Sequence, residues 1–368
     1  MRETPVDRRT VLLASGAATA SLAGCISTSP KPAGGEGGDS GSDSGNTEGG
    51  SGDGGVSSLS AGGSSTVYPI VSKAASVWKA NRPAGDEDYW QPSKYGYDTE
   101  KSYADYWASK YGFETQDNGP PFNVTVGLSH SGTGLEKLMK GQVDIANASA
   151  PVKDELSDAS ESKLKKFQNH VVGVDAQPIV VSKAIYEAGV KKLTAEQVRK
   201  IYKGEITKWS QIPSYNGPEK EIQAVGRAVG SGTDTAFRSN MLSGPNAKMP
   251  GVDVRKGQNQ KVKTLVERSN NAIAYMALAF VSGDVKPIKL SFDGKVYEPG
   301  KNLAEKNYPL SRDLHCYTWK DTSKKEAAFL RSIISDYGQK NFVAAEDYSK
   351  LTKKRQQNQL DKLPDPEQ

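Results

Sequence analysis

The chain has 368 residues, of which 36% are hydrophobic and 25% are charged, and its formal net charge is +5 at pH 7. This length is too great for one ordinary hydrophobic core and suits two lobes. The basic residues are spread along the chain without an arginine-rich block, so we do not expect nucleic-acid binding. Two cysteines and three scattered histidines give neither a disulfide framework nor metal-ligand spacing, and we expect no metal or cofactor.

Residues 1–24 have the pattern of an export signal. Arg8 and Arg9 precede a weakly apolar stretch that ends in Leu22-Ala23-Gly24-Cys25, and this arrangement resembles a twin-arginine signal with a lipoprotein cleavage box. The stretch is too short and too rich in glycine to span a bilayer, which takes about 20 helical residues. The resemblance to bacterial and archaeal lipoproteins implies that Cys25 carries lipid, which would hold the protein at the outer face of the cytoplasmic membrane.

Residues 25–57 consist largely of Gly, Ser, Asp and Glu, with almost nothing to bury. Such a composition is typical of a flexible acidic tether. We therefore expect the folded part of the protein to begin near residue 58.

Between residues 84 and 121 the chain is dense in Tyr, Trp, Gly and charged residues. Tyr103, Tyr106, Trp107 and Tyr111 fall at helical spacing. A helix that packs on its own domain explains this spacing better than a partner surface does, because aromatic side chains contribute large apolar areas to a core.

Short apolar β patterns then alternate with helical patterns. The alternation predicts an α/β fold. Strands are expected at 122–126, 170–174, 178–181, 221–225 and 272–276, and helices near 195–202 and 261–269.

Three turns rich in small hydroxyl residues each come just before a helical pattern. The first N–H groups of a helix have no partner within the helix and favour an anion. One such turn is more often a helix cap than a ligand site, but three suggest convergence on one oxyanion. The turns are Gly62-Gly63-Ser64-Ser65-Thr66, Ser131-Gly132-Thr133 and Ser231-Gly232-Thr233.

Arg227 lies four residues before Ser231. From there a guanidinium could reach over the turn and give paired N–H donors to two oxygens of a tetrahedral anion. Without the neighbouring turn, an ordinary surface arginine would be the simpler interpretation.

Five segments come in the order found in phosphate-binding proteins of phosphate ABC importers, and the chain resembles that family from Leu59 to about Phe342. The resemblance implies a type II periplasmic-binding-protein fold, in which two lobes are joined by two crossovers and the ligand lies in the cleft between them. The segments are Gly63-Ser64-Ser65-Thr66-Val67-Tyr68-Pro69, Ser131-Gly132-Thr133-Gly134, Asp144-Ile145-Ala146-Asn147-Ala148-Ser149-Ala150-Pro151, Arg227-Ala228-Val229-Gly230-Ser231-Gly232-Thr233 and Tyr308-Pro309-Leu310-Ser311-Arg312.

The resemblance also implies the lobes and the ligand-binding residues. The first lobe would comprise residues 58–175 and 285–368, and the second lobe residues 176–284. The ligand would be inorganic phosphate, delivered by a monomeric, lipid-anchored protein to the permease of an ABC importer. The first lobe would contribute Ser65, Thr66, Val67, Ser131 and Ser149 to the site, and the second Arg227, Ser231, Gly232 and Thr233.

The chain departs from the family pattern at Ser149. The well-known form of the family has an aspartate at this position, two residues before the proline, and that carboxylate accepts a proton from hydrogen phosphate. A carboxylate rejects fully deprotonated sulfate, whereas a serine need not do so. A subgroup that this chain resembles also has serine there and is associated with phosphate. Asp144 is a possible substitute acceptor, although a role in bracing its own turn is the simpler interpretation.

Two other functions compete with phosphate capture. A phosphatase or serine hydrolase would also use an oxyanion pocket, and His130 precedes Ser131 directly. Sequence neighbours in a strand point to opposite faces, however, and this site lacks both a Gly-x-Ser-x-Gly elbow and the Asp/His clusters of two-metal phosphatases. A binding protein for another oxyanion, such as sulfate, molybdate or tungstate, is the closer alternative.

Overall fold

The computed structural model describes residues 58–303 and 307–367. The predicted export signal, the lipidation site at Cys25 and the tether lie outside this part of the chain. Within it, no helix combines the length and the apolar character that a membrane crossing requires.

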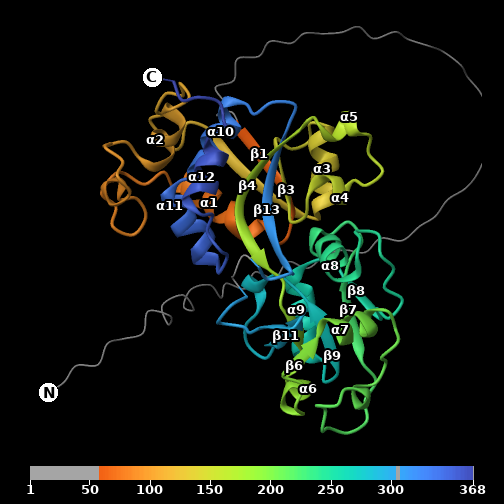
Figure 1. Ribbon diagram of the computed structural model, residues 1–368. Helices are drawn as coiled ribbons and strands as arrows, with labels where there is room; N and C mark the ends of the chain where they lie inside the picture. Colours follow the sequence, from red (N-terminus) through yellow and green to blue (C-terminus); the bar gives the residue numbers. More distant parts are fainter. Residues whose placement is uncertain (1–57, 304–306, 368) are drawn as a thin grey trace, which may run out of the picture. The chain divides into compact units, whose positions relative to one another are not determined.

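The first lobe is built on a five-stranded mixed sheet with the order β2-β1-β3-β13-β4 (Figure 1). β1 pairs in parallel with β2 and β3, whereas β13 runs antiparallel to β3 and β4. Its strands are β1 (Ser58–Ser64), β2 (Asn123–Ser129), β3 (Ile145–Ala148), β4 (Phe167–Ala176) and β13 (Ser311–Trp319).

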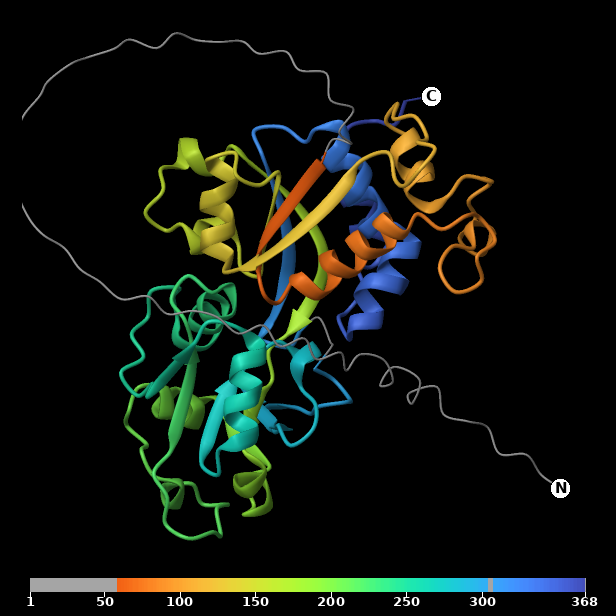
Figure 2. The same ribbon diagram turned by 180° about the vertical axis from the view of Figure 1, so that it is seen from behind.

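Helices cover both faces of this sheet. Figures 1 and 2 show α1 (Tyr68–Ala80) and α10 (Lys324–Ile334) on one face and α3 (Ser131–Met139) on the other. Two apolar clusters match this arrangement. The larger one holds the buried faces of α1 and α10, and the smaller one includes Leu135 and Leu138 of α3.

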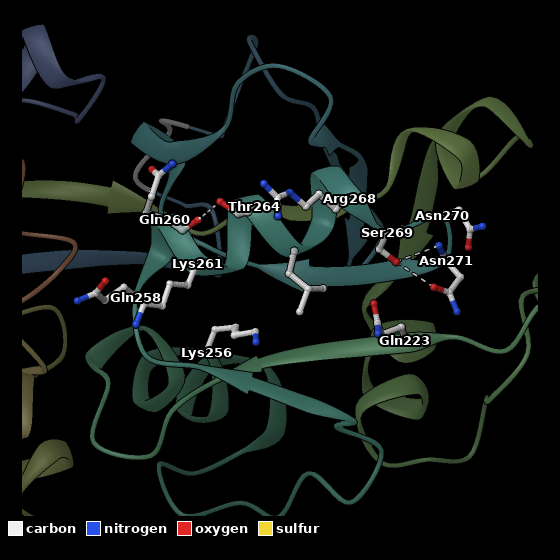
Figure 3. A pocket seen from close by; sticks show the side chains of 11 residues that line it. Gln223, Lys256, Gln258, Gln260, Lys261, Thr264, Arg268, Ser269, Asn270 and Asn271 are labelled. Atoms are coloured by element: carbon white, nitrogen blue, oxygen red, sulfur yellow. Dashed lines mark hydrogen bonds between the residues drawn. The ribbon is translucent and has the colours of Figure 1, made fainter. Parts of the chain in front are cut away.

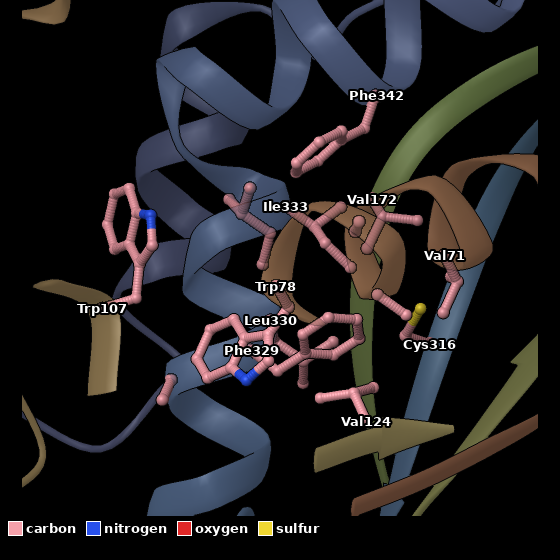
Figure 4. Packing of buried hydrophobic residues seen from close by; sticks show 14 of the residues in the cluster. Val71, Trp78, Trp107, Val124, Val172, Cys316, Phe329, Leu330, Ile333 and Phe342 are labelled. Atoms are coloured by element: carbon pink, nitrogen blue, oxygen red, sulfur yellow. The ribbon is translucent and has the colours of Figure 1, made fainter. Parts of the chain in front are cut away.

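Aromatic side chains dominate the larger cluster. Trp78 packs edge-on against Phe329 with ring centroids 5.7 Å apart, and its indole N–H donates to the Phe122 carbonyl (Figure 4). Cys316, which the sequence predicts to be a buried thiol, lies in the same cluster. Its pKa is raised to about 12 by burial.

The aromatic stretch 84–121 belongs to this core. It contains η1 (Pro92–Tyr95) and α2 (Tyr103–Ser109), and the side chains of Tyr103, Trp107 and Tyr111 are buried. Packing on its own domain, rather than display of an aromatic surface, is therefore the observed role of these three residues.

The second lobe contains a five-stranded sheet with the order β10-β5-β9-β7-β8 and a small sheet with the order β12-β11-β6. α7 (Ala195–Tyr202), a helix that the sequence predicts at the same residues, is capped by Thr194. The Thr194 hydroxyl accepts from the Gln197 N–H, and the Gln197 side chain accepts from the Thr194 N–H. The strands are β5 (Ile179–Val181), β6 (Lys192–Thr194), β7 (Gln223–Arg227), β8 (Val254–Lys256), β9 (Ala272–Tyr275), β10 (Lys286–Pro287), β11 (Lys289–Phe292) and β12 (Lys295–Tyr297).

The remaining helical elements are divided between the two lobes. In the first lobe they are α4 (Val152–Glu155), α5 (Glu161–Leu164), α11 (Asp336–Gly338), η4 (Gln339–Val343), η5 (Ala344–Glu346) and α12 (Lys353–Leu360). In the second they are α6 (Lys183–Glu187), α7 (Ala195–Tyr202), η2 (Trp209–Gln211), α8 (Gly232–Leu242), α9 (Asn259–Arg268) and η3 (Leu278–Phe280).

The return to the first lobe comes later in the chain than the sequence predicts. We expected residues from 285 onward to belong to the first lobe, but β10 pairs with β5, and β11 pairs with β6, both in the second lobe. Tyr308 and Leu310 also pack in the second apolar cluster. The crossovers are thus the end of β4 and the start of β13, two strands that pair with each other. β10 and β11 lie about 100 residues after their partners β5 and β6 in the sequence. Pairing over such a separation leaves no local signal in the sequence.

Candidate functional site

The two Ser-Gly-Thr phrases lie against each other where the lobes meet. Ser131 begins α3 in the first lobe, and Ser231 precedes α8 in the second. The Gly132 N–H donates to the Gly230 carbonyl at 3.1 Å, and the Gly232 N–H donates to Ser131 Oγ at 3.1 Å. The start of one helix therefore contacts the start of the other.

Neither phrase is used as a simple helix cap. Ser231 occupies the N-cap position of α8, but its side chain makes no capping hydrogen bond. Ser131 Oγ accepts from the Ser149 N–H at 3.2 Å as well as from Gly232. The Ser131 hydroxyl thus joins three segments of the chain instead of serving its own helix.

The hydroxyl cluster that follows β1 reaches the same place. Thr66 Oγ1 lies 3.1 Å from Thr233 Oγ1 across the lobe boundary. Ser64 Oγ donates to Ser149 Oγ at 2.9 Å, and the Ser64 hydroxyl also accepts from the Thr66 N–H. All three turns that the sequence singles out are consequently neighbours in the fold.

Arg227 ends β7, and its side chain is buried, with 1% of the residue exposed. Nε donates to the Lys256 carbonyl at 3.1 Å, and Nη2 donates to the Gly257 carbonyl at 2.8 Å. Nη2 also donates to Ser65 Oγ of the other lobe at 3.1 Å. Burial, with Arg312 nearby, lowers the pKa of Arg227 to about 10. The guanidinium is therefore held by the backbone at the end of β8, within the second lobe, while it faces the first lobe.

Asn259, the first residue of α9, completes the surroundings of Arg227. Its Oδ1 accepts from Arg227 Nη1 at 2.6 Å, and its Nδ2 donates to Thr66 Oγ1 at 3.0 Å. Asn259 carries no signal of this role in the sequence, since an amide at the start of a helix is an ordinary N-terminal residue.

Arg312 brings a second buried guanidinium to the site. Nη1 donates to the Gly232 carbonyl at 3.0 Å, and Nη2 donates to the hydroxyls of Thr66 and Thr233, both at 3.2 Å. Asp175 neutralises it through an Nη2–Oδ2 contact of 2.7 Å. The segment 308–312 is one of the family motifs, but nothing in its local pattern distinguishes Arg312 from a surface arginine.

A second acidic group near the site, Asp234, is also paired. Asp234 of α8 contacts Arg238 at 2.7 Å and Arg255 at 3.2 Å, and it accepts a short hydrogen bond from the Tyr275 hydroxyl. Tyr275 in turn accepts from the Arg227 N–H at 3.1 Å. Asp234 therefore stabilises the end of β7 without forming an ion pair with Arg227.

Val67 and Asp144 do not present their side chains at the site. The Val67 side chain is buried in the apolar cluster of the first lobe, so this residue can offer a ligand only its backbone. Asp144 Oδ2 accepts from the Ser60 N–H at 2.7 Å and from the Ser60 hydroxyl at 2.8 Å. Asp144 thus braces its own turn against β1, which is the simpler of the two roles considered for it.

His130 and Ser131 do not form a nucleophile with its base. Within the described ranges, Nδ1 of His130 is buried and has no hydrogen-bond partner, while Ser131 Oγ is occupied by two backbone N–H groups. Burial, together with Arg227 and Lys261, lowers the pKa of His130. A serine nucleophile requires a base within hydrogen-bonding distance.

The second lobe also carries a surface pocket of about 850 Å³ (Figure 3). It lies along α9, and none of the residues predicted to bind ligand lines it. Its cationic lining residues are Lys256, Lys261 and Arg268, joined by polar residues such as Gln223 and Asn271.

Known proteins match most of the chain. It is 29% identical over 331 residues to the phosphate-binding protein PstS of Staphylococcus epidermidis, a match that covers 86% of this chain and 87% of that protein. It is 28% identical to the phosphate-binding protein PstS of Bacillus subtilis, with coverage of 64% and 74%. The crystal structure of an ABC-type phosphate transport receptor from Vibrio cholerae superimposes with a TM-score of 0.52 at 24% identity, covering 80% of this chain and 100% of that one.

Residues 96–337 match the PBP superfamily domain. This range includes both crossovers together with Arg227 and Arg312, although the Ser65 and Thr66 hydroxyls that these arginines contact lie before it. With its two lobes joined through β4 and β13, the chain belongs to the PBP superfamily.

Proposed function

We propose that this chain is an extracytoplasmic solute-binding protein that captures inorganic phosphate and delivers it to the permease of an ABC importer. The curated relatives that match over most of their length are named phosphate-binding proteins. The meeting of three hydroxyl-rich turns between two lobes supports an anion as the ligand, since such turns present N–H and O–H donors together.

The observation that carries the proposal is the charge of Arg227. Among residues 58–303 and 307–367 this buried guanidinium has no ion-pair partner, whereas Arg312 is paired with Asp175, and Asp234 with Arg238 and Arg255. A buried charge is unfavourable unless an opposite charge compensates it. A bound oxyanion supplies that compensation, and a guanidinium matches its geometry.

The donors for the remaining oxygens come from both lobes. We assign the ligand to a set of side chains and backbone N–H groups that surround the two guanidinium groups. The proposed set is Ser65, Thr66, Val67, Ser131, Ser149, Arg227, Ser231, Gly232 and Thr233, in which Val67 and Gly232 contribute backbone.

Binding would be coupled to closure of the lobes. Hydroxyls from opposite lobes already contact each other in this structure, as Thr66 and Thr233 do. β4 and β13 are the two connections about which such a closure would rotate, in the manner of a hinge. Domain closure of this kind removes the anion from water and strengthens every hydrogen bond to it.

The N-terminal sequence supports a proposal for where in the cell the protein resides. We propose export by the twin-arginine route, lipid attachment at Cys25 and residence at the outer face of the cytoplasmic membrane as a monomer. The acidic tether would let the folded lobes reach a permease. We also propose that the chain binds its ligand without chemical turnover, because Ser131 lacks a base.

Titration calorimetry with phosphate, arsenate, sulfate and molybdate tests the proposed ligand. We expect phosphate to bind most tightly and arsenate, its chemical analogue, to follow. Tighter binding of sulfate or molybdate would replace phosphate by another oxyanion. Hydrolysis of a generic phosphomonoester by the metal-free protein would contradict the proposal that the chain is not an enzyme.

A further inference from the structure

A surface pocket of the second lobe, the α9 pocket, lies outside the proposed phosphate site. It measures about 850 Å³ and is lined by α9, the end of β8 with the loop after it, the start of β7 and the segment 269–271. Ten of its eleven lining residues are Lys, Arg, Ser, Thr, Asn or Gln, and the other is Leu265. This lining lies wholly within the described residues and contains no acidic side chain. The α9 pocket is therefore polar and cationic.

One face of α9 forms a wall of the α9 pocket. Lys261, Leu265 and Arg268 follow one another at intervals of four and three residues, which places them on one side of the helix. Val262 and Val266, on another side, are buried in an apolar cluster of the second lobe. Burial of the two valines fixes the rotation of the helix about its axis, so Lys261 and Arg268 are held on the pocket side (Figure 3).

The three cations of the α9 pocket have no anionic partner. Within the described part of the chain, Lys256, Lys261 and Arg268 form no ion pair. The acidic residue of α9, Glu267, instead lies 3.8 Å from Lys263, which does not line the pocket. Like charges that share a pocket repel one another, and a bound anion relieves this repulsion. The charge of the lining therefore calls for an anionic ligand.

The residue types of the lining are those that hold a phosphate chain. In protein–nucleic acid complexes, Lys, Arg, Ser, Thr, Asn and Gln side chains are the groups that donate to phosphate oxygens. The eleven lining residues include no aromatic side chain on which a base could stack, and Leu265 is the one apolar residue among them. Protein partners, in contrast, are anchored by buried aromatic and apolar groups. The lining thus suits a chain of phosphates without bases.

The cations of the α9 pocket are spread out rather than gathered at one point. Lys261 and Arg268 are seven residues apart on α9, which corresponds to about 10 Å along the helix axis. Lys256 adds a third positive charge from β8. A linear chain of phosphates contacts all three cations without drawing their side chains together, whereas a single orthophosphate does not.

We propose that the α9 pocket binds a linear inorganic polyphosphate, at a site distinct from the cleft between the lobes. The inference goes beyond the proposed function and does not depend on it. The two sites adjoin, because the Lys256 carbonyl accepts from Arg227 Nε at 3.1 Å while the Lys256 side chain lines the pocket. Each phosphoanhydride bond that water cleaves at the end of such a chain releases one orthophosphate, the ligand proposed for the cleft.

The first experiment titrates the unaltered protein with long-chain inorganic polyphosphate by calorimetry, in orthophosphate sufficient to saturate the cleft. We expect polyphosphate to bind and its affinity to fall with added salt. The slope of log K against log salt should be about −2 to −3, as three neutralised phosphates require. Absence of binding at low salt would overturn the inference. Displacement of the polymer by orthophosphate at constant ionic strength would also overturn it, since the polymer would then occupy the cleft.

The second experiment compares two double variants that each lose two positive charges. Lys261→Gln with Arg268→Gln removes the two cations of α9, whereas Lys163→Gln with Lys165→Gln removes two exposed lysines of the first lobe. We expect polyphosphate affinity to fall about tenfold in the first variant and to change little in the second. Equal losses would show that the polymer responds only to net charge and would contradict a site at α9. Thermal unfolding checks that both variants are folded.

Two further measurements identify the ligand and separate this inference from the proposed function. Poly-glutamate, a linear chain of carboxylates, should bind more weakly than polyphosphate at equal charge concentration, and equal binding would assign the pocket to an acidic peptide instead. Orthophosphate affinity should be the same in both double variants, and its loss in the first would show that Lys261 and Arg268 serve the cleft. If the unaltered protein binds no orthophosphate, the proposed function fails, while the polyphosphate titration still tests the α9 pocket.

Discussion

Arg312 and Asp175 form a buried ion pair between the two strands that join the lobes. They are register partners on β13 and β4, with Nε and Nη2 of Arg312 at 3.0 and 2.7 Å from Asp175 Oδ2. The other Asp175 oxygen accepts from the Leu278 N–H of the second lobe at 3.1 Å, and Arg312 reaches the Gly232 carbonyl. One pair thus connects the hinge strands to the second lobe.

Removing the charge of Asp175 should destabilise the protein strongly. Asp175→Asn leaves the Arg312 guanidinium buried without its carboxylate, and breaking a buried pair in this way typically costs about 3–5 kcal/mol of unfolding free energy. Urea unfolding measures this loss. The control is Asp313→Asn, whose partially exposed pair with Arg355 should contribute no more than about 1 kcal/mol. Equal losses of unfolding free energy in the two variants would show that the Arg312–Asp175 pair stabilises the protein no more than an exposed pair does.

Arg227 should account for much of the affinity for phosphate. Arg227→Ala removes the buried, unpaired guanidinium, and truncating one partner of a buried hydrogen-bonded charge pair typically costs about 2–5 kcal/mol of binding free energy. Calorimetric titration with phosphate measures the change. Arg268→Ala removes the same charge from an exposed position on α9 and should leave the affinity nearly unchanged. An R227A affinity equal to that of R268A would remove Arg227 from the site.

Gly232 should be required for the lobes to meet. The added methyl group of Gly232→Ala would lie 2.5 to 2.7 Å from the oxygens of Ser131, Ser149 and Glu155, all three of which belong to the first lobe. We expect phosphate affinity to fall at least tenfold, a change of about 1.4 kcal/mol in binding free energy. Gly244→Ala is the control, since its Cβ would have no neighbour within 4 Å. Unchanged phosphate affinity in G232A would show that the closed contact is not needed for binding.

The stability of the protein should fall in mild acid because His170 is buried in its neutral form. Burial, and then Lys362, lower its pKa to about 4, whereas an unfolded histidine has a pKa of about 6.5. Between these values the unfolded chain binds more protons, so the free energy of unfolding decreases as the pH falls from about 6.5 to about 4, by about 3 kcal/mol in total.

This prediction is tested by comparing how the free energy of unfolding changes with pH in the parent protein and in His170→Gln. Urea unfolding between about pH 7 and about pH 4 should show a shallower loss of stability in the variant, whose side chain does not titrate. Some slope should persist, since burial also lowers the pKa of His315 to about 4. Identical slopes in the two proteins would show that His170 does not control this transition.

Several secondary-structure elements could be read from local patterns, whereas others, such as β13 and α10, were not predicted. α7 occupies the predicted range 195–202, and α9 and β9 lie within one or two residues of their predicted bounds. β2 and β4 are longer than predicted, because their outer residues gain strand pairing with β1 and β13 that no local pattern reveals. Local periodicity thus specified the type and approximate place of these elements, and long-range pairing set their extent.

The sequence by itself determined the α/β class, the family and the three hydroxyl-rich turns, because periodicity and turn composition are local properties of the chain. Only the tertiary structure decided that residues 286–303 and 307–310 belong to the second lobe and that Asn259, Arg312 and Glu155 lie beside the site. These three side chains come from separate elements, α9, β13 and α4, and each looks ordinary where it stands in the sequence. Their significance depends on burial and on the charge of their neighbours, which exist only after the lobes have folded and met.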